Sequence, residues 1–253
     1  MNKDFIIEQL KKELKGKDSF SRKELFDLYR QFEPDLKNST FRWRIYQLKE
    51  KKVITQISQD KFSLSYKPVF KPGIEDYEKK IYLKLEKQFP GLKQCIWSTK
   101  AINEFMLNLP GKSIIVLQVE KDGIEPVFDF LKSQNFGTVY IQPEEKEIER
   151  YIFETEKSIA LQQLTSRAPL QKFSKVHTIT IEKMIVDLFS DKNLFSIFQG
   201  SELAHIINNS YQRYSINFTT LFHYASRRGK EKDLRHFLLE KTDIPKIIIN
   251  DKT

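Results

Sequence analysis

The fold is decided by residues 39–52, which read Ser39-Thr40-Phe41-Arg42-Trp43-Arg44-Ile45-Tyr46-Gln47-Leu48-Lys49-Glu50-Lys51-Lys52. Phe41, Ile45 and Leu48 are spaced i, i+4 and i+7, so this stretch predicts a helix with one apolar face. The hydrophobic residues 53–57 follow at once and predict a strand. A helix followed by a strand, a polar turn and a second strand is the order typical of a winged helix.

The other faces of this predicted helix are polar, cationic and aromatic. Such a surface suits the DNA major groove, where a guanidinium can pair with guanine through two hydrogen bonds while lysines contact phosphates. The residues expected to contact DNA are Ser39, Thr40, Arg42, Trp43, Arg44, Gln47, Lys51 and, in the turn between the strands, Lys61. Two alternatives stay open, because a charged helix face is often merely solvated and a winged helix can bind a protein instead. The spacing also leaves open whether Trp43 faces solvent or packs against the first helix.

Residues 1–66 predict one small unit of three helices and a hairpin. The first helix is expected at residues 4–14. The second begins at Ser21, because Ser21-Arg22-Lys23-Glu24 has the form of a capping box. Ser39 is expected to cap the third helix, and the polar turn of the hairpin would be the wing. We interpret this unit as a winged helix-turn-helix DNA-binding domain.

The rest of the chain predicts a mixed α/β domain with a helical C-terminal part. Residues 67–73 contain two prolines and a glycine and predict a linker. Helices then alternate with strands, which is typical of an α/β sheet. The helices are expected at 74–88, 101–107 and 124–134, and the strands at 95–98, 113–119, 138–141, 158–164 and 175–178. The later helices are expected at 181–189, 201–208, 218–226 and 230–240. The predicted domain covers residues 74–243 and is followed by a tail at 244–253.

The charge of the chain is uneven along its length. The formal net charge is +9, from 43 basic and 34 acidic side chains. Residues 1–66 and 167–253 each carry a net charge of +5, whereas residues 67–166 carry −1. A basic surface favours anionic partners such as nucleic acid. We therefore expect two separate basic surfaces, one from each end of the chain.

The sequence favours the cytoplasm. Cys95 is the single cysteine, so the chain has neither an intrachain disulfide nor a zinc site built from cysteines. The charged first residues lack the apolar core of a signal peptide. The longest apolar runs, residues 114–117 and 247–249, are far too short to span a bilayer. We expect no membrane partner.

The residue types used in catalysis lack the spacing that catalysis requires. Gly111-Lys112-Ser113 precedes a predicted strand, whereas a P-loop follows one. Gly200-Ser201 is not followed by the Asp-x-Asp pair that holds magnesium, and Glu120-Lys121-Asp122 lacks a nuclease's Glu-x-Lys spacing. Metal-ligand spacing is also missing among His177, His205, His223 and His236. We predict a binding protein without catalytic residues, metal or cofactor; a diverged nuclease or nucleotidyltransferase is the alternative.

Two C-terminal stretches carry a family resemblance. The first reads Val176-His177-Thr178-Ile179-Thr180-Ile181-Glu182-Lys183-Met184-Ile185-Val186-Asp187-Leu188-Phe189. The second reads Leu221-Phe222-His223-Tyr224-Ala225-Ser226-Arg227-Arg228-Gly229-Lys230, then Leu234-Arg235-His236-Phe237-Leu238-Leu239. With the order of the predicted domains, they resemble the AbiEi-type antitoxins of type IV (abortive infection) toxin–antitoxin systems. Met184, His236 and the hairpin turn depart from that family's pattern.

The resemblance implies a DNA-binding transcriptional autorepressor encoded beside a nucleotidyltransferase-like toxin. Its partners would be double-stranded operator DNA and, functionally, the cognate toxin. The C-terminal part would neutralise the toxin's effect, with or without a stable complex. The matched residues also have an architectural interpretation, in which Thr180 caps a helix and Gly229 ends another.

Five cations gather around Gly229, and we call them the C-terminal basic group. They are Arg227, Arg228, Lys230, Lys232 and Arg235. So many like charges repel one another unless carboxylates or an anionic partner lie close. Glu231 and Asp233 lie among them, and Glu182 or Asp187 could contribute from the earlier helix at 181–189. Full pairing would make the group structural; otherwise we expect it to be the partner surface of the antitoxin, which binds RNA, DNA or an acidic surface of the toxin.

Overall fold

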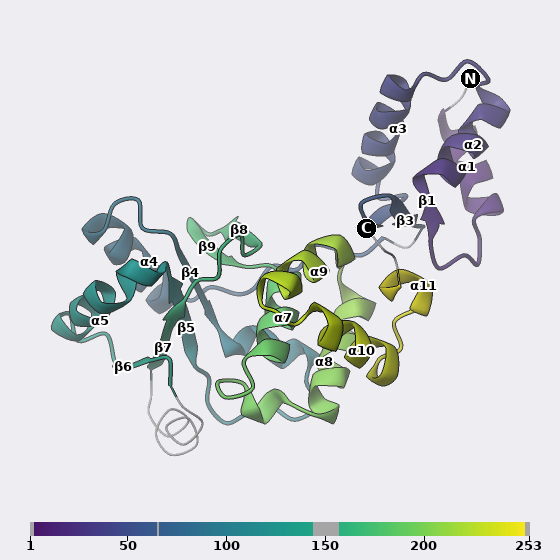
Figure 1. The fold of residues 1–253 in the computed structure, drawn as a ribbon. Helices are drawn as coiled ribbons and strands as arrows, with labels where there is room; N and C mark the ends of the chain where they lie inside the picture. Colours follow the sequence, from purple (N-terminus) through teal and green to yellow (C-terminus); the bar gives the residue numbers. More distant parts are fainter. Residues whose placement is uncertain (1–2, 65, 144–156, 251–253) are drawn as a thin grey trace.

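The computed structural model describes residues 3–64, 66–143 and 157–250 and confirms a mixed α/β chain (Figure 1). Three helices and three short strands come first. They are α1 (Lys3–Glu13), β1 (Phe20–Ser21), α2 (Arg22–Phe32), α3 (Asn38–Glu50), β2 (Thr55–Ser58) and β3 (Lys61–Ser63). In Figure 1 the three helices stand apart from the rest of the chain, while the β2–β3 hairpin lies beside the C-terminal helices.

Local sequence signals explain where α2 and α3 begin. The predicted capping box is confirmed, because Glu24 N donates to Ser21 Oγ at 3.1 Å and Ser21 N donates to Glu24 Oε2 at 2.7 Å. The backbone hydrogen bond from Ser21, together with Lys17, lowers the pKa of Glu24 to about 2. The predicted cap at Ser39 is wrong. Helix α3 begins at Asn38, two residues earlier than that cap implies, and its cap position, Lys37, makes no side-chain hydrogen bond.

The N-terminal elements enclose their own hydrophobic core. Phe41, Ile45 and Leu48 of α3 are all buried in it, as their spacing predicts. The strands form an antiparallel sheet in the order β1-β3-β2, in which Phe20 pairs with Phe62. The two-residue strand β1 was not predicted. Its pairing with β3 ties the chain before α2 to the hairpin after α3.

The middle of the chain forms a four-stranded sheet with helices before and between its strands. Its elements are α4 (Asp76–Gln88), β4 (Gln94–Ser98), a 3₁₀ helix (Thr99–Phe105), β5 (Ile115–Val119), α5 (Ile124–Ser133), β6 (Thr138–Ile141) and β7 (Ser158–Gln163). A further 3₁₀ turn, Lys121–Gly123, precedes α5. The strand order is β4-β5-β7-β6; β4 runs antiparallel to β5, whereas β5, β7 and β6 are parallel.

Alternating side chains give this sheet two buried faces. Ile96, Leu117 and Ile159 belong to one hydrophobic core together with residues of α4 and α5. Trp97 and Val116 belong to a second core, which the C-terminal helices share. The sheet is therefore a central layer between α4 and α5 on one side and the C-terminal helices on the other.

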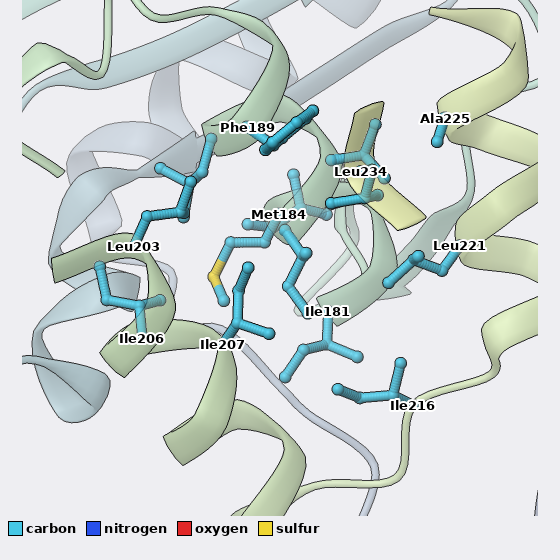
Figure 2. Packing of buried hydrophobic residues seen from close by; sticks show 14 of the residues in the cluster. Ile181, Met184, Phe189, Leu203, Ile206, Ile207, Ile216, Leu221, Ala225 and Leu234 are labelled. Atoms are coloured by element: carbon cyan, nitrogen blue, oxygen red, sulfur yellow. The ribbon is translucent and has the colours of Figure 1, made fainter. Parts of the chain in front are cut away.

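The C-terminal part consists of a hairpin and five α-helices within the described residues. They are β8 (Leu170–Phe173), β9 (Val176–Ile179), α7 (Ile181–Ser190), α8 (Ser201–Arg213), α9 (Phe218–Arg227), α10 (Glu231–Lys241) and α11 (Lys246–Ile249), with a 3₁₀ turn at Ser196–Phe198. Every residue from 181 to 189 is buried, because α7 lies between the sheet and the other helices. Figure 2 shows side chains of α7, α8, α9 and α10 packing together in this core.

The segment predicted as a linker lies packed against the C-terminal part. Residues 67–73 form no helix or strand, yet Phe70 is buried, with its ring centroid 5.3 Å from that of Tyr214. Lys67 Nζ donates to Tyr211 O, and Ser215 N donates to Pro68 O at 2.9 Å. These contacts fix the path of the chain between the N-terminal elements and the sheet.

Candidate nucleic-acid interface

Helix α3 presents a second face opposite its buried residues. Ser39, Arg42, Trp43 and Tyr46 follow the spacing i, i+3, i+4 and i+7, so they lie on one side of the helix. All four are exposed, and Trp43 and Tyr46 are 48% and 59% exposed. We call these four residues the α3 face. Trp43, whose orientation the sequence left open, thus lies on the exposed side of the helix.

The structure distributes the other predicted DNA contacts of α3 around this face. Thr40 is exposed beside it, and Lys51 is exposed at the C-terminal end of the helix. Gln47 is half-buried. Sequence reasoning missed Tyr46, although its position three residues after Trp43 was a usable signal. A cation and two aromatic rings exposed on one helix face offer both hydrogen-bond donors and stacking surfaces.

Arg44 has a different environment from Arg42. Its Nη2 lies 3.1 Å from Glu33 Oε1, at the end of α2, and both side chains are largely buried at 20% and 24% exposure. Tyr29 lies in the same environment, where burial raises its pKa to about 12. The guanidinium also lies 5.9 Å from the centre of the Trp43 ring. Arg44 therefore joins the end of α2 to α3.

The hairpin turn lies against the C-terminal helices. Gln59 N donates to Thr219 Oγ1 of α9 at 3.0 Å, and Lys61 Nζ donates to the carbonyl oxygen of Ile247 in α11 at 3.2 Å. Ile57 of β2 is buried in the C-terminal core. Lys61 is thus engaged at the junction of the two parts of the chain, and the structure does not group it with the α3 face.

The C-terminal basic group is divided among several sets of contacts. Arg235 is the most engaged, because Nε lies 3.0 Å from Glu231 Oε1, its guanidinium lies 3.5 Å from the centre of the Phe222 ring, and Nη1 donates to Ile249 O. Lys230 lies 3.7 Å from Asp233. Lys232 is exposed. Two members of the group are therefore paired by Glu231 and Asp233, the two carboxylates that lie among them in sequence.

Arg227 and Arg228 bond instead to the loop that follows β7. Arg227 Nη2 donates to Ser166 Oγ, and Arg228 Nη1 donates to Thr165 Oγ1 at 3.2 Å. Within the described residues, neither arginine has a carboxylate at ion-pair distance. The suggested pairing with Glu182 or Asp187 of α7 is wrong, because Glu182 accepts a hydrogen bond from Asn217 N and Asp187 accepts from Lys183 and Tyr224.

A protein-family model matches most of the chain. Residues 40–244 match the model of a family of unknown function, DUF6577. The chain belongs to this family. The match begins inside α3 and extends past α10, so the DUF6577 region includes the α3 face apart from Ser39, together with the hairpin, the sheet and the C-terminal basic group. No curated protein matches the chain.

The DUF6577 region contains a buried ionic network that explains the first C-terminal signature. Lys183 and Asp187 lie one turn apart on α7, and their side chains are 0% and 2% exposed. Lys183 Nζ donates to Asp187 Oδ2, and Tyr224 Oη donates to Asp187 Oδ1 at 2.8 Å. Burial disfavours the charged ammonium, but the carboxylate of Asp187 outweighs it and raises the pKa of Lys183. The network therefore joins α7 to α9.

Other residues of the two signatures act at the ends of helices. Thr180 Oγ1 accepts a hydrogen bond from Lys183 N at 3.3 Å, as predicted for the helix cap. Glu182 Oε1 accepts from Asn217 N at 2.8 Å, just before α9 begins. Gly229 has a φ of +65°, which lets the chain turn from α9 into α10 as predicted. These residues hold the helices in place.

The described residues show neither a metal-ligand cluster nor an activated cysteine. In residues 3–64, 66–143 and 157–250, no three histidine, cysteine, aspartate or glutamate side chains are grouped as metal ligands. Burial raises the pKa of the Cys95 thiol to about 12, which makes its thiolate scarce. Over the same ranges, no helix is long and apolar enough to cross a membrane.

Proposed function

We propose that the chain is a DNA-binding transcriptional repressor in which α1 to α3 and the β2–β3 hairpin form a winged helix-turn-helix. The α3 face carries this proposal, because it combines Arg42 with two exposed aromatic rings on a helix whose opposite face is buried. The order of the elements and the β1-β3-β2 sheet support it. A net charge of +5 over residues 1–66 adds attraction for phosphate.

The proposed roles follow from exposure. Arg42 reads a base edge in the major groove, and Trp43 and Tyr46 contact the sugar–phosphate backbone or thymine methyl groups. Ser39, Thr40 and Lys51 contact phosphates from the two ends of the helix. Arg44 orients α3 and does not read bases. Lys61 takes part in DNA binding only if the hairpin leaves its contact with α11.

The antitoxin role rests on the resemblance of the C-terminal signatures. We propose that the chain is an AbiEi-type antitoxin that acts in the cytoplasm, represses its own operator and counteracts a nucleotidyltransferase-like toxin. Lys232, which is exposed, and Lys230, whose side chain is 44% exposed, would face the partner. Arg235 would maintain the shape of that surface. Co-expression with a candidate toxin encoded next to this gene tests this role. The wild-type chain should then restore the growth that the toxin inhibits.

The DNA-binding proposal is tested by fluorescence anisotropy with the duplex upstream of the gene. The variant Arg42→Ala with Trp43→Ala removes the centre of the α3 face, and Lys232→Ala is the control with a surface cation removed elsewhere. We expect the double variant to lose specific binding while its thermal unfolding stays unchanged. Retention of wild-type affinity by this variant would overturn the assignment and favour a winged helix that binds protein.

A further inference from the structure

A large cavity lies outside the sheet, where the parallel strands β5 and β7 end. Its volume is 1050 Å³. Lys121 follows β5, and residues 164–167 follow β7; both loops line the cavity. Leu164 N donates to Val119 O at 2.7 Å and holds the two loops together. Open α/β sheets bind ligands at this place, beyond the carboxyl ends of their strands.

Positive charge predominates in the lining. The cations are Lys93, Lys121, Arg167 and Arg228. The carboxylates are Glu86 and Glu120, and Glu120 Oε1 already accepts a hydrogen bond from Lys93 N at 3.2 Å. A concave site with this excess of cations concentrates anions. Four cations against two carboxylates match a ligand that carries about two negative charges, such as a phosphate monoester.

Hydrogen bonds hold Arg228 and the loop after β7 in place at one side of the cavity. Arg228 lies directly after α9 and donates to Thr165 Oγ1, while its neighbour Arg227 holds Ser166 of the same loop. Arg167 adopts a φ of +58°, a conformation that residues other than glycine rarely take. Guanidinium groups bind phosphate oxygens through paired, charge-assisted hydrogen bonds, so Arg228 and Arg167 suit this group.

Another part of the lining suits a planar ring. His177 of β9 is exposed, and its Nδ1 lies 2.7 Å from Tyr82 Oη of α4, which fixes its orientation. Leu92 and Leu170 add apolar surface to the lining. The volume lies at the upper end of the range for small-molecule sites, roughly 300–1,000 Å³, and far exceeds the need of a bare phosphate ion.

We propose that this cavity binds a mononucleotide, with its phosphate at Arg228 and Arg167 and its base against His177, Leu92 and Leu170. The site is separate from the α3 face and comes from different elements. The proposal therefore does not depend on DNA binding, and each can fail without the other.

Isothermal titration tests it on the full-length protein in magnesium-free buffer. The probes are the four ribonucleoside monophosphates, their triphosphates, adenosine and inorganic phosphate. We expect saturable binding of at least one nucleotide, with adenosine and phosphate each at least about tenfold weaker, because each lacks one part of the ligand. Arg167→Gln with Arg228→Gln should weaken nucleotide binding about tenfold or more. Lys232→Gln, a cation outside the cavity, is the matched control.

Hydrogen exchange of the wild-type protein gives an independent readout if the double variant fails to fold. Bound nucleotide should slow exchange at residues 119–122 and 164–168. The proposal is overturned if no probe saturates at millimolar concentration, if inorganic phosphate binds as tightly as nucleotides, or if a folded double variant binds normally. Protection confined to residues 39–51 would also overturn it, because nucleotides would then occupy the α3 face.

Discussion

The α3 segment and the C-terminal basic group look alike in sequence but differ in what their cations contact. Each has several lysines and arginines within about one or two helical turns of one another. On α3, Arg42 is exposed on a face shared with two aromatic rings. Around Gly229, Arg235 is held by a carboxylate, a ring and a carbonyl oxygen, and the two arginines before the glycine bind a loop.

The difference shows that clustered charge in a sequence does not measure charge available to a partner. Whether a cation is accessible to a partner depends on which helices, strands and loops pack against the segment that carries it. Helix α3 packs through one apolar face and leaves the opposite one exposed, whereas α7, α9 and α10 pack against one another (Figure 2). Cations near the contacts between α9 and its neighbours therefore bond to other parts of the protein and are less accessible to a partner. Four predictions test this difference between the two regions.

The largest effect is expected inside the C-terminal helices. Asp187→Ala leaves the ammonium of Lys183 buried without its carboxylate, and removing one partner of a buried ion pair costs about 3–5 kcal/mol of the free energy of unfolding. Urea denaturation followed by circular dichroism measures this loss. The paired change Lys183→Met with Asp187→Leu removes both charges and should recover most of it. A fully stable Asp187→Ala protein would mean that the network does not hold α7 to α9.

Two arginines on α3 should separate binding from stability. Arg42→Ala should weaken specific DNA binding by about 1–3 kcal/mol and leave the free energy of unfolding within about 0.5 kcal/mol of wild type. Arg44→Ala should lower the free energy of unfolding by about 1–2 kcal/mol, because Glu33 then loses its partner in a largely buried site.

Anisotropy and urea denaturation on both variants measure the two quantities. Glu33→Gln is the control for Arg44, since it breaks the same ion pair from α2. The comparison fails if Arg42→Ala unfolds the protein or if Arg44→Ala leaves stability unchanged while abolishing binding.

A similar division is expected within the C-terminal basic group. Arg235→Ala removes the ion pair with Glu231 and the contact with the Phe222 ring, so it should lower the free energy of unfolding by about 1–2 kcal/mol. Lys232→Ala, three residues earlier and exposed, should change it by less than about 0.5 kcal/mol. Thermal unfolding of the two proteins side by side measures the difference. Equal stability of the two variants would mean that exposure does not distinguish these cations.

Sequence alone predicted the elements well where the signal was local. The i, i+4, i+7 spacing in α3 and the capping box at Ser21 depend on residues within a few positions, and both are confirmed. Strand β6 was predicted with its observed bounds. The strands β1 and β8 and the helix α11 were missed. They are two to four residues long, and β1 exists through pairing with a strand about forty residues away.

Sequence alone did not predict which residues surround the cations of the candidate sites. Arg44 and Arg42 look equivalent in sequence, and the carboxylate that distinguishes them lies eleven residues earlier. Lys61 looks like a wing residue, but its partner is a carbonyl 186 residues later. Likewise, the hydroxyls that hold Arg227 and Arg228 lie in a loop more than sixty residues before them. Side-chain availability depends on such distant contacts, so sequence could propose the cations but not rank them.

The smallest effect is expected at the edge of the α3 surface. Lys51 is exposed at the end of α3, where a phosphate contact would be electrostatic and independent of base sequence. Lys51→Ala should therefore weaken binding to specific and random duplexes alike and reduce the slope of log affinity against log salt concentration by about one. Anisotropy titrations at several salt concentrations measure the slope, and Lys232→Ala should leave it unchanged. If Lys232→Ala reduces the slope as much as Lys51→Ala does, DNA also contacts the C-terminal basic group, and the two regions share one function.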